Sequence, residues 1–322
     1  VKIIELAMTS DEMLARFDRE VRLASQLMHP NTVEVFDYGR TPEGQPFYAM
    51  EFLDGLTLQQ IVEQHGPLPA ARAAHALRGI AGSLSEAHAR GLVHRDIKPA
   101  NVMLCRRGGE DDVVKVLDFG LVKDTRSPHT RDLTRALRVL GTPAYMAPER
   151  IEQPDSADTR SDLYALGAVG YFLLAGKAPF GGDSELALAF QVVHTPAPRA
   201  SAAAVAPVPA ALDELIARCL AKSADDRPAS AGEVAADLDR LLGMQILHDL
   251  LGKEELDLHR RGLGEAHQGL SQAGGLAQLD ETVRHQPREG SAQDLVVDAD
   301  LGEVALRGGN LRLRSGLLEI PV

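Results

Sequence analysis

The chain has 322 residues, of which 44% are apolar and 25% are charged, a composition typical of a folded globular protein rather than one disordered throughout. Its 34 basic and 46 acidic residues give a net charge of −12, which argues against a surface built to bind nucleic acid or an anionic membrane. No run reaches the roughly 18 consecutive apolar residues of a membrane span, and no signal peptide is apparent. The expected partners are therefore proteins or small molecules.

The two cysteines, Cys105 and Cys219, lie far apart in the sequence and within apolar patterns. This placement predicts two reduced thiols in the core rather than a disulfide. Reduced thiols indicate a reducing, cytoplasmic compartment.

The N-terminal part of the chain is predicted to form a strand, a helix and a hairpin. The opening letters VKII indicate the second half of a β-strand. Thr9 and Glu12 have the spacing of a capping box, so a helix is expected from there to His29 and Pro30. Two strands separated by a proline and glycine turn follow, at residues 32–38 and 47–52.

After residue 53 the pattern changes to long helices, which predicts a lobe boundary. A charged turn joins one further strand pair, at residues 102–105 and 113–117, and an irregular segment then runs to about residue 148. The linker at residues 195–209 is rich in alanine and proline. Helices are expected at residues 56–65, 69–90, 160–175, 184–194, 210–220 and 230–242.

Residues 243–322 differ in composition from the rest of the chain. They are rich in Gly, Leu, Arg, Ala and Gln, and no aromatic residue occurs anywhere after Phe190. Disorder or marginal structure is the expectation, with weak strand pairing or a linker as alternatives.

Three motifs carry the chemistry of the sequence: HRDIKPAN at residues 94–101, DFG at 118–120 and GTPAYMAPE at 141–149. Their order and spacing resemble those of the serine/threonine protein kinases, most closely the bacterial members, over about residues 1–242. The resemblance implies an α+β fold with two lobes, a small β-rich N-lobe at residues 1–53 and a large helical C-lobe at 54–242. Residues 243–322 would be a C-terminal extension.

The resemblance also implies the reaction and the residues that perform it. Phosphoryl transfer from ATP needs charge neutralisation and an oriented nucleophile. Asp96 would orient the hydroxyl of the substrate and accept its proton, and Lys98 would reach the transferred phosphoryl group. Asn101 and Asp118 would hold the Mg²⁺ ions that bridge the phosphates.

Lys2 and Glu20 match the family's phosphate-binding lysine and its helical partner, so an inward ion pair between them is expected. The family's glycine-rich loop belongs about 20 residues before this lysine, and only Val1 precedes Lys2. The resemblance therefore implies a truncated N-lobe and impaired activity.

The segment MEFLDG resembles the hinge between the lobes. Met50 would be the gatekeeper next to the nucleotide. Backbone groups of Glu51 and Leu53 would pair with the adenine edge, and Asp54 would bind the ribose hydroxyls.

Three residues are implied to regulate activity or set specificity. Arg95 would pair with a phosphate added to the loop between residues 118 and 149. Thr134 best matches the activating phosphosite. Thr142 would hydrogen-bond the catalytic Asp and Lys, and a threonine there indicates serine/threonine specificity.

Five further residues are implied to be structural. His94 and Phe119 would pack between the lobes, Asp162 would anchor the catalytic loop, and Glu149 and Arg227 would form a buried ion pair.

The predicted function is thus ATP- and Mg²⁺-dependent phosphorylation of Ser or Thr on proteins, with transient homodimers for autophosphorylation. Two alternatives stay open. A scaffolding pseudokinase would more often have a substituted Asp96 or Asp118, and a small-molecule phosphotransferase of the same fold would not need the segment around Thr142.

Overall fold

The computed structural model describes most of the first 244 residues and four short strands near the C-terminus. The chain divides into two compact units, Val1–Leu242 and Gly243–Val322. The described residues are 1–3, 11–42, 44–119, 143–153, 158–244, 296–299, 302–307, 310–313 and 319–321.

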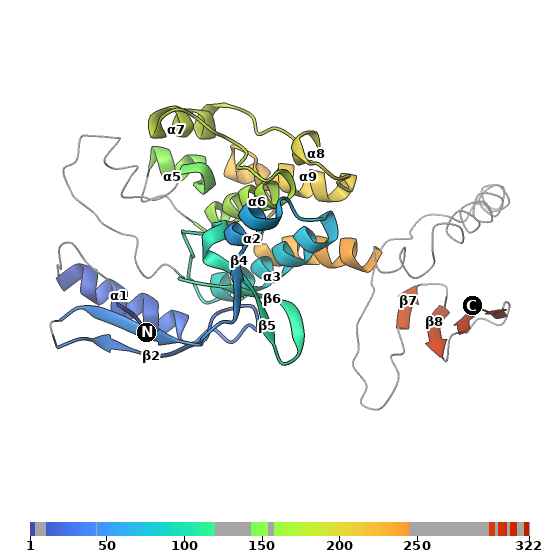
Figure 1. The fold of residues 1–322 in the computed structure, drawn as a ribbon, viewed down its shortest axis with the longest axis horizontal. Coiled ribbons are helices and arrows are strands. Elements are labelled where there is room, and N and C mark those ends of the chain that lie inside the picture. Colours follow the sequence, from blue (N-terminus) through green and yellow to red (C-terminus); the bar gives the residue numbers. More distant parts are fainter. Residues whose placement is uncertain are drawn as a thin grey trace. The chain divides into compact units, whose positions relative to one another are not determined.

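The first unit begins with a three-stranded antiparallel sheet, in the order β1-β3-β2. Its strands are β1 (Lys2–Ile3), β2 (Val35–Arg40) and β3 (Pro46–Met50). Helix α1 (Asp11–Ala24) lies along this sheet (Figure 1). Its buried face consists of Phe17, Val21 and Ala24, a helical spacing that the sequence predicted.

A second antiparallel sheet, in the order β4-β5-β6, lies at the junction with the helical part. It consists of β4 (Gly55–Thr57), β5 (Val102–Arg107) and β6 (Glu110–Val116). Helix α2 (Leu58–His65) follows β4 directly, and Thr57 and Gln60 form a capping box at its start. The sequence pattern had assigned residues 56 and 57 to this helix, so the strand β4 was missed.

Helix α3 (Ala70–Ala89) packs closely on β6. Gly79 makes this approach possible, because a Cβ atom there would lie 2.7 Å from Cβ of Val114. The backbone of the helix can therefore approach the strand more closely than a side chain would allow.

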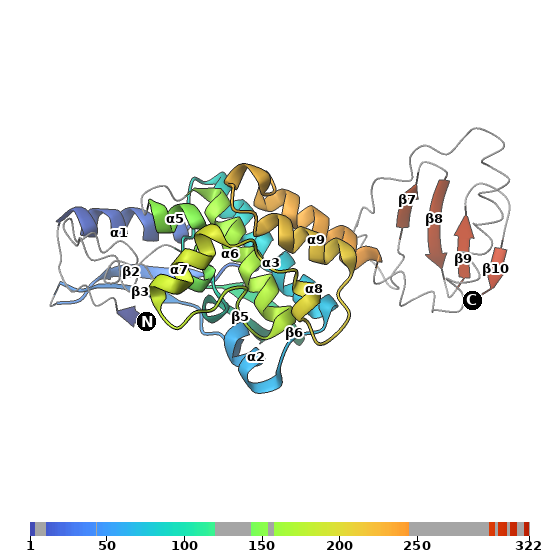
Figure 2. The same cartoon turned by 90° about the horizontal axis from the view of Figure 1, so that it is seen from above.

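The helical part is built around α6 (Thr159–Ala175), whose residues 161–174 are all buried. This helix packs against both α3 and α9 (Ala210–Cys219) and lies in the middle of the helices in both views (Figures 1 and 2). The remaining helices are α5 (Pro148–Glu152), α7 (Glu185–His194), α8 (Ala200–Ala203) and residues 231–244, with 3-10 turns at Pro99–Asn101, Pro143–Tyr145 and Ala224–Asp226.

One carboxylate joins the end of the α1 region to helix α3. The Glu86 side chain accepts hydrogen bonds from the backbone N–H groups of Met28, at 3.0 and 3.1 Å, and of His29, at 2.8 Å. The segment after α1 is thereby fastened to the helical part of the unit.

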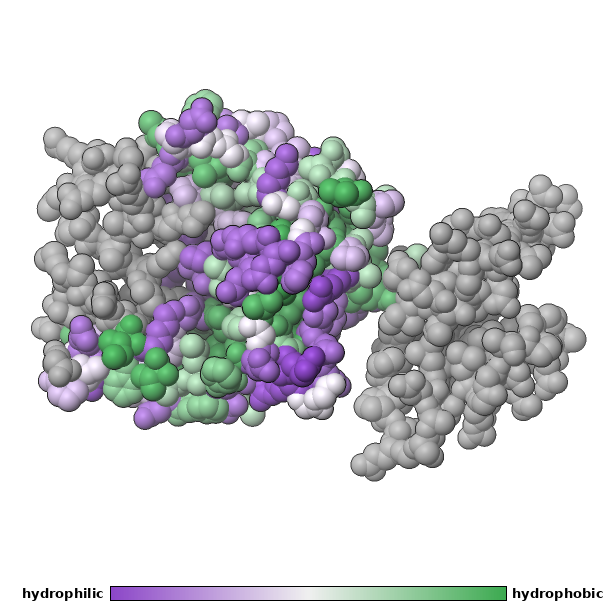
Figure 3. Space-filling view, in the orientation of Figure 1, coloured by the Kyte–Doolittle hydropathy of each residue, from purple (hydrophilic) through white to green (hydrophobic). Residues whose placement is uncertain are grey.

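The observed elements agree with most of the predicted ones and differ mainly at their ends. The alanine and proline linker at residues 195–209 contains the short helix α8. Cys105 and Cys219 are free and buried, as their apolar surroundings predicted. On the face shown in Figure 3, hydrophilic and hydrophobic residues alternate in small patches over the first unit, as expected for a surface facing water.

In the second unit the structure describes four antiparallel strands in the order β10-β9-β8-β7. This result corresponds to the strand pairing that the sequence left open as an alternative. The strands are β7 (Val296–Ala299), β8 (Gly302–Arg307), β9 (Asn310–Leu313) and β10 (Glu319–Pro321). Across the described residues of both units, no helix is both long and apolar enough to span a membrane.

Candidate active site

The catalytic loop lies between α3 and β5 and brings three of the predicted residues together. Asn101 donates from Nδ2 to the carboxylate Oδ2 of Asp96 at 2.9 Å and to its backbone oxygen at 2.9 Å. Lys98 Nζ lies 3.0 Å from the same Oδ2 atom. The carboxylate of Asp96 is therefore fixed by an amide on one side and an ammonium group on the other.

Asp162 on α6 fixes the start of this loop, at His94 and Arg95. It is 1% exposed and accepts hydrogen bonds from the backbone N–H groups of His94 and Arg95, each at 2.8 Å. His88 Nε2 lies 2.8 Å from the same carboxylate. Burial acts to raise the pKa of Asp162, but the hydrogen bond and charge of His88 outweigh it, so this pKa is lowered.

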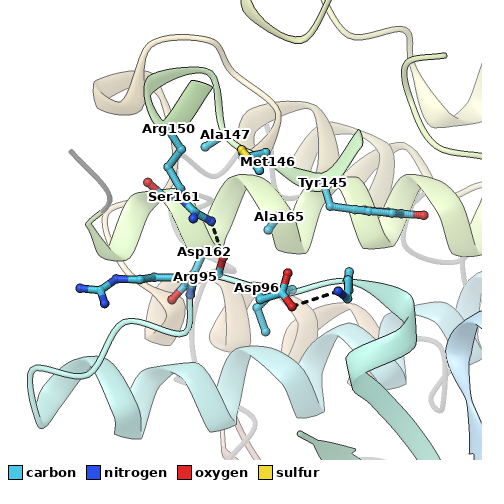
Figure 4. Close-up of a pocket in the computed structure, with 11 residues that line it drawn as sticks. Arg95, Asp96, Tyr145, Met146, Ala147, Arg150, Ser161, Asp162 and Ala165 are labelled. Atoms are coloured by element: carbon cyan, nitrogen blue, oxygen red, sulfur yellow. Dashed lines mark hydrogen bonds and ion pairs between the residues drawn. The ribbon is translucent and has the colours of Figure 1, made fainter. Parts of the chain in front are cut away.

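Anchoring by Asp162 supports an unusual backbone conformation. Arg95 has φ of 65°, in the left-handed region that costs a non-glycine residue free energy. Figure 4 shows a small pocket beside this residue, into which Arg150 extends to donate from Nη1 to the backbone oxygen of Arg95. Asp96 lines the same pocket, so the loop conformation is fixed from α5 and from α6.

Asp118 lies two residues after the end of β6 and next to the catalytic loop, because the N–H of Leu117 donates to the backbone oxygen of Asn101 at 2.9 Å. It also has a left-handed backbone, with φ of 56°. Its Oδ2 atom pairs with Nζ of Lys2, and its Oδ1 atom accepts a hydrogen bond from the hydroxyl of Tyr48. Both carboxylate oxygens of Asp118 therefore have a partner from the first sheet.

Tyr48 is a site residue that the sequence reading missed. It is fully buried on β3, and its Cα is directly opposite that of Lys2 on β1. Burial and the charge of the Asp118 carboxylate both raise the pKa of Tyr48, so its hydroxyl stays protonated and donates. The signal was the strand alternation, which places Tyr48 on the same face as Met50.

The predicted ion pair between Lys2 and Glu20 is corrected by the structure. Lys2 pairs with Asp118, and Glu20 pairs with Arg95 Nη1 at 2.9 Å. Lys2 and Arg95 each pair with a carboxylate that lies far away in the sequence. Arg95, predicted to receive a loop phosphate, is thus held by α1.

The oxygen ligands that Mg²⁺ prefers are present at this site. Because Asn101 turns its Nδ2 toward Asp96, its amide oxygen faces away from that carboxylate. The described residues contain no cluster of three or more His, Cys, Asp or Glu that could hold a metal ion by protein groups alone. Magnesium commonly takes one or two protein ligands plus substrate phosphates, so Asn101 and Asp118 fit this ion chemically.

The hinge residue Glu51 has its side chain turned into the protein. Its carboxylate, 9% exposed, pairs with Lys115 Nζ at 2.6 Å and with Arg107. Its backbone N–H donates to the oxygen of Glu34 at 3.0 Å. Burial acts to raise the pKa of Glu51, but the Lys115 hydrogen bond and nearby charges lower it.

The other hinge residues are placed differently. Met50 ends β3 and packs against the core, and Leu53 is half-buried. Asp54 lines a groove with Leu56, Leu104 and other residues of β4, β5, β6 and α2, and this groove contains neither Asp96 nor Asp118. Asp54 is exposed at this groove, next to Leu53 in the chain, and its contact with a ribose stays a prediction.

The residues predicted to be structural are buried or paired. The rings of His94 and Phe119 lie 4.6 Å apart, His94 is fully buried, and burial lowers its pKa so that it is neutral. Glu149 and Arg227 form a bidentate pair at 2.8 Å in both contacts. Thr134 and Thr142 lie outside the described residues.

The chain was compared with known proteins. A model of the protein kinase domain matches residues 1–237. Serine/threonine-protein kinase pkn3 of Myxococcus xanthus is 42% identical over 241 residues, which are 74% of this chain and 44% of that protein. PknL of Mycobacterium tuberculosis is 38% identical over 242 residues, covering 75% of this chain and 58% of that protein. The chain thus spans about half the length of these curated relatives.

Solved structures give the same result. The kinase domain of Mycobacterium tuberculosis PknI superposes with a TM-score of 0.57 at 31% identity, covering 74% of this chain and 84% of that one. Rad53 in complex with AMP-PNP superposes with a TM-score of 0.53 at 25% identity, covering 68% of this chain and 53% of that one.

Proposed function

Since the chain belongs to the protein kinase domain family, we propose that it transfers the γ-phosphoryl group of ATP to Ser or Thr hydroxyls of proteins, with Mg²⁺. Residues 1–53 and 54–242 would be the two lobes of the catalytic domain, and 243–322 an extension. The bacterial relatives named serine/threonine-protein kinases and the nucleotide analogue held by Rad53 support this proposal.

The observation that carries the proposal is the arrangement of Asp96, Lys98 and Asn101. The Asp96 carboxylate is held between the other two side chains, so it can orient a substrate hydroxyl and accept its proton. Lys98, 3.0 Å from this carboxylate, would neutralise charge on the transferred phosphoryl group. Little covalent chemistry is required of the protein beyond this positioning.

Asn101 and Asp118 would hold magnesium, and Met50 with the backbones of Glu51 and Leu53 would contact adenine. When bound, the metal ion would neutralise charge on the nucleotide phosphates. For this role the carboxylate of Asp118 must release Lys2, whose ammonium group would then contact the phosphates.

Activation by loop phosphorylation would exchange the ion pairs seen here. A phosphate on Thr134 would compete with Glu20 for Arg95, because a doubly charged group with three acceptor oxygens binds a guanidinium more strongly than a carboxylate does. Glu20 would then be free to pair with Lys2, as kinase activity requires. Autophosphorylation in a transient homodimer would supply that phosphate, and Thr142 would set the preference for Ser and Thr.

The free thiols of Cys105 and Cys219 fit a cytoplasmic location, which we include in the proposal.

One observation favours a second candidate, a scaffolding pseudokinase. Lys2 occupies Oδ2 of Asp118 in this structure, so this oxygen is not offered to a metal ion until Lys2 leaves. Such a protein would bind partners and would not transfer phosphate.

The experiment that tests the proposal is phosphate transfer from radiolabelled ATP with Mg²⁺ to a generic basic protein. Asp96→Asn should reduce incorporation by roughly 100-fold or more, because it removes the proton acceptor. Asp183→Asn, an exposed site with the same chemical change, should not reduce it. Equal labelling by wild type and Asp96→Asn would contradict the proposal, and no labelling by the wild type would favour the scaffold.

A further inference from the structure

The hydroxyl of Tyr48 takes no part in the proposed phosphoryl transfer, yet it contacts the residue proposed to hold the metal. It donates to Oδ1 of Asp118 from a side chain that is fully buried. A buried tyrosine hydroxyl needs a hydrogen-bond partner, but an apolar residue would fill this site without one. The identity of that partner points to a function.

The two groups that contact Asp118 differ in their freedom to move. Lys2 is 40% exposed and has four rotatable bonds, so it can leave Oδ2 at small cost. The Tyr48 ring has two side-chain torsions and is enclosed by the core, on a strand paired with β1 and with β2. When Lys2 moves to a nucleotide, the Tyr48 hydroxyl will still be beside Oδ1.

Asp118 also needs to be held. Its left-handed backbone, with φ of 56°, is one that a non-glycine residue adopts only where its surroundings fix it. Its neighbour Phe119 is fixed by packing against His94, and the Tyr48 hydroxyl fixes the carboxylate itself.

We infer that Tyr48 is a positioning residue for metal binding: its hydroxyl holds one carboxylate oxygen of Asp118 and so presents the other oxygen, which Lys2 occupies here, to a nucleotide-bound divalent cation. The inference rests on the proposed function, because it assigns Asp118 to the metal. It goes beyond that function by naming a residue of this chain that no kinase motif in the sequence contains.

The test is a titration of Mn²⁺, followed by its electron paramagnetic resonance signal, into the full chain with AMP-PNP. Tyr48→Phe removes only the hydroxyl and should weaken Mn²⁺ binding by about tenfold, as expected for losing one hydrogen bond to a charged group. Tyr38→Phe is the matched control, because Tyr38 is directly opposite Tyr48 on β2. It should leave Mn²⁺ affinity unchanged.

A second arm separates an effect through Asp118 from a general loss of structure. In the Asp118→Ala background, which removes the oxygen that Tyr48 holds, adding Tyr48→Phe should cause no further weakening of Mn²⁺ binding, and further weakening there would overturn the inference. Thermal melts will verify that each variant folds. If Tyr48→Phe does not, Tyr48→Met removes the same hydroxyl and fills the space with a flexible side chain.

Unchanged or tighter Mn²⁺ binding by folded Tyr48→Phe, with normal binding by wild type, would overturn the inference and leave the proposed function intact. A wild-type chain that binds no Mn²⁺ with AMP-PNP would overturn both. Equal weakening in Tyr38→Phe would show a general effect of the sheet and would also overturn the inference.

Discussion

Replacing Glu149 by Gln should destabilise the first unit more than any exposed charge substitution. Arg227, the partner of Glu149, has a side chain with 0% exposure, and all five of its N–H donors are used. Two of them bond the Glu149 carboxylate at 2.8 Å. The other three bond the backbone oxygens of Ala221, Arg160 and Lys222 at 2.9–3.1 Å.

The magnitude follows from what remains after the substitution. Removing one partner of a buried ion pair costs about 3–5 kcal/mol, because the other charge is left buried and uncompensated. The three backbone oxygens that accept from Arg227 remain, and the Gln oxygen can accept one further bond. Glu149→Gln should therefore lower the free energy of unfolding by about 3 kcal/mol, the lower end of this range. For a unit of this size, that corresponds to a fall in Tm of about 6–12 °C.

Differential scanning calorimetry at neutral pH measures this change. The matched control is Glu214→Gln, which removes an exposed pair with Arg199, where the side chains are 57% and 49% exposed. This control should shift Tm by no more than about 2 °C. Equal shifts for the two variants would refute the reasoning that burial makes the Glu149 pair strong.

The same pair predicts a dependence on pH. Burial acts to raise the pKa of Glu149, but the hydrogen bonds and charge of Arg227 lower it overall. A lowered pKa in the folded state gives stability that is present above the unfolded value of about 4.3 and is lost as pH falls through the folded value. The Tm difference between wild type and Glu149→Gln should therefore shrink below about pH 4.

Two further substitutions test the packing of the first unit by urea denaturation. Lys115→Met should lower the free energy of unfolding by about 3 kcal/mol, because Glu51 loses its buried counter-ion. Arg106→Met breaks an exposed ion pair and should have a much smaller effect. Gly79→Ala should cost about 1–3 kcal/mol even though alanine favours helices, because the added methyl group meets Val114; a neutral or stabilising result would show that α3 and β6 can separate.

The arrangement of Asp96, Lys98 and Asn101 was predictable from the sequence because one motif, which resembles that of the kinase family, contains all three. Asn101 reaches Asp96 across only five positions, and the motif that contains both leaves little freedom for their relative placement. The motif itself therefore predicted that Asp96 and Asn101 lie close together.

The ion pairs of the site were not predictable in the same way. Lys2 and Asp118 are 116 positions apart, and Arg95 and Glu20 are 75 apart. Long side chains choose among several carboxylates within reach according to how α1 lies against the helical part. Neither spacing nor periodicity reports that arrangement.

The strand β4 (Gly55–Thr57) could not be predicted from the sequence for a different reason. This three-residue strand begins directly after Asp54, and its pairing with β5 fixes the Asp54 backbone, whose oxygen accepts from Arg106 N at 2.9 Å. So short a strand gives no alternation pattern, and residues 56 and 57 were therefore assigned to the helix that follows.

The Glu86 carboxylate, which accepts from the backbone N–H groups of Met28 and His29, makes the segment after α1 a fixed pivot. A rotation of α1 about this point displaces each residue in proportion to its distance along the helix axis. Glu20 lies four residues, about one helical turn, before the end of α1, so a tilt of the helix would carry its carboxylate away from Arg95. Glu20 would then exchange its ion-pair partner through a tilt of α1 alone, without unfolding of the segment at Met28 and His29.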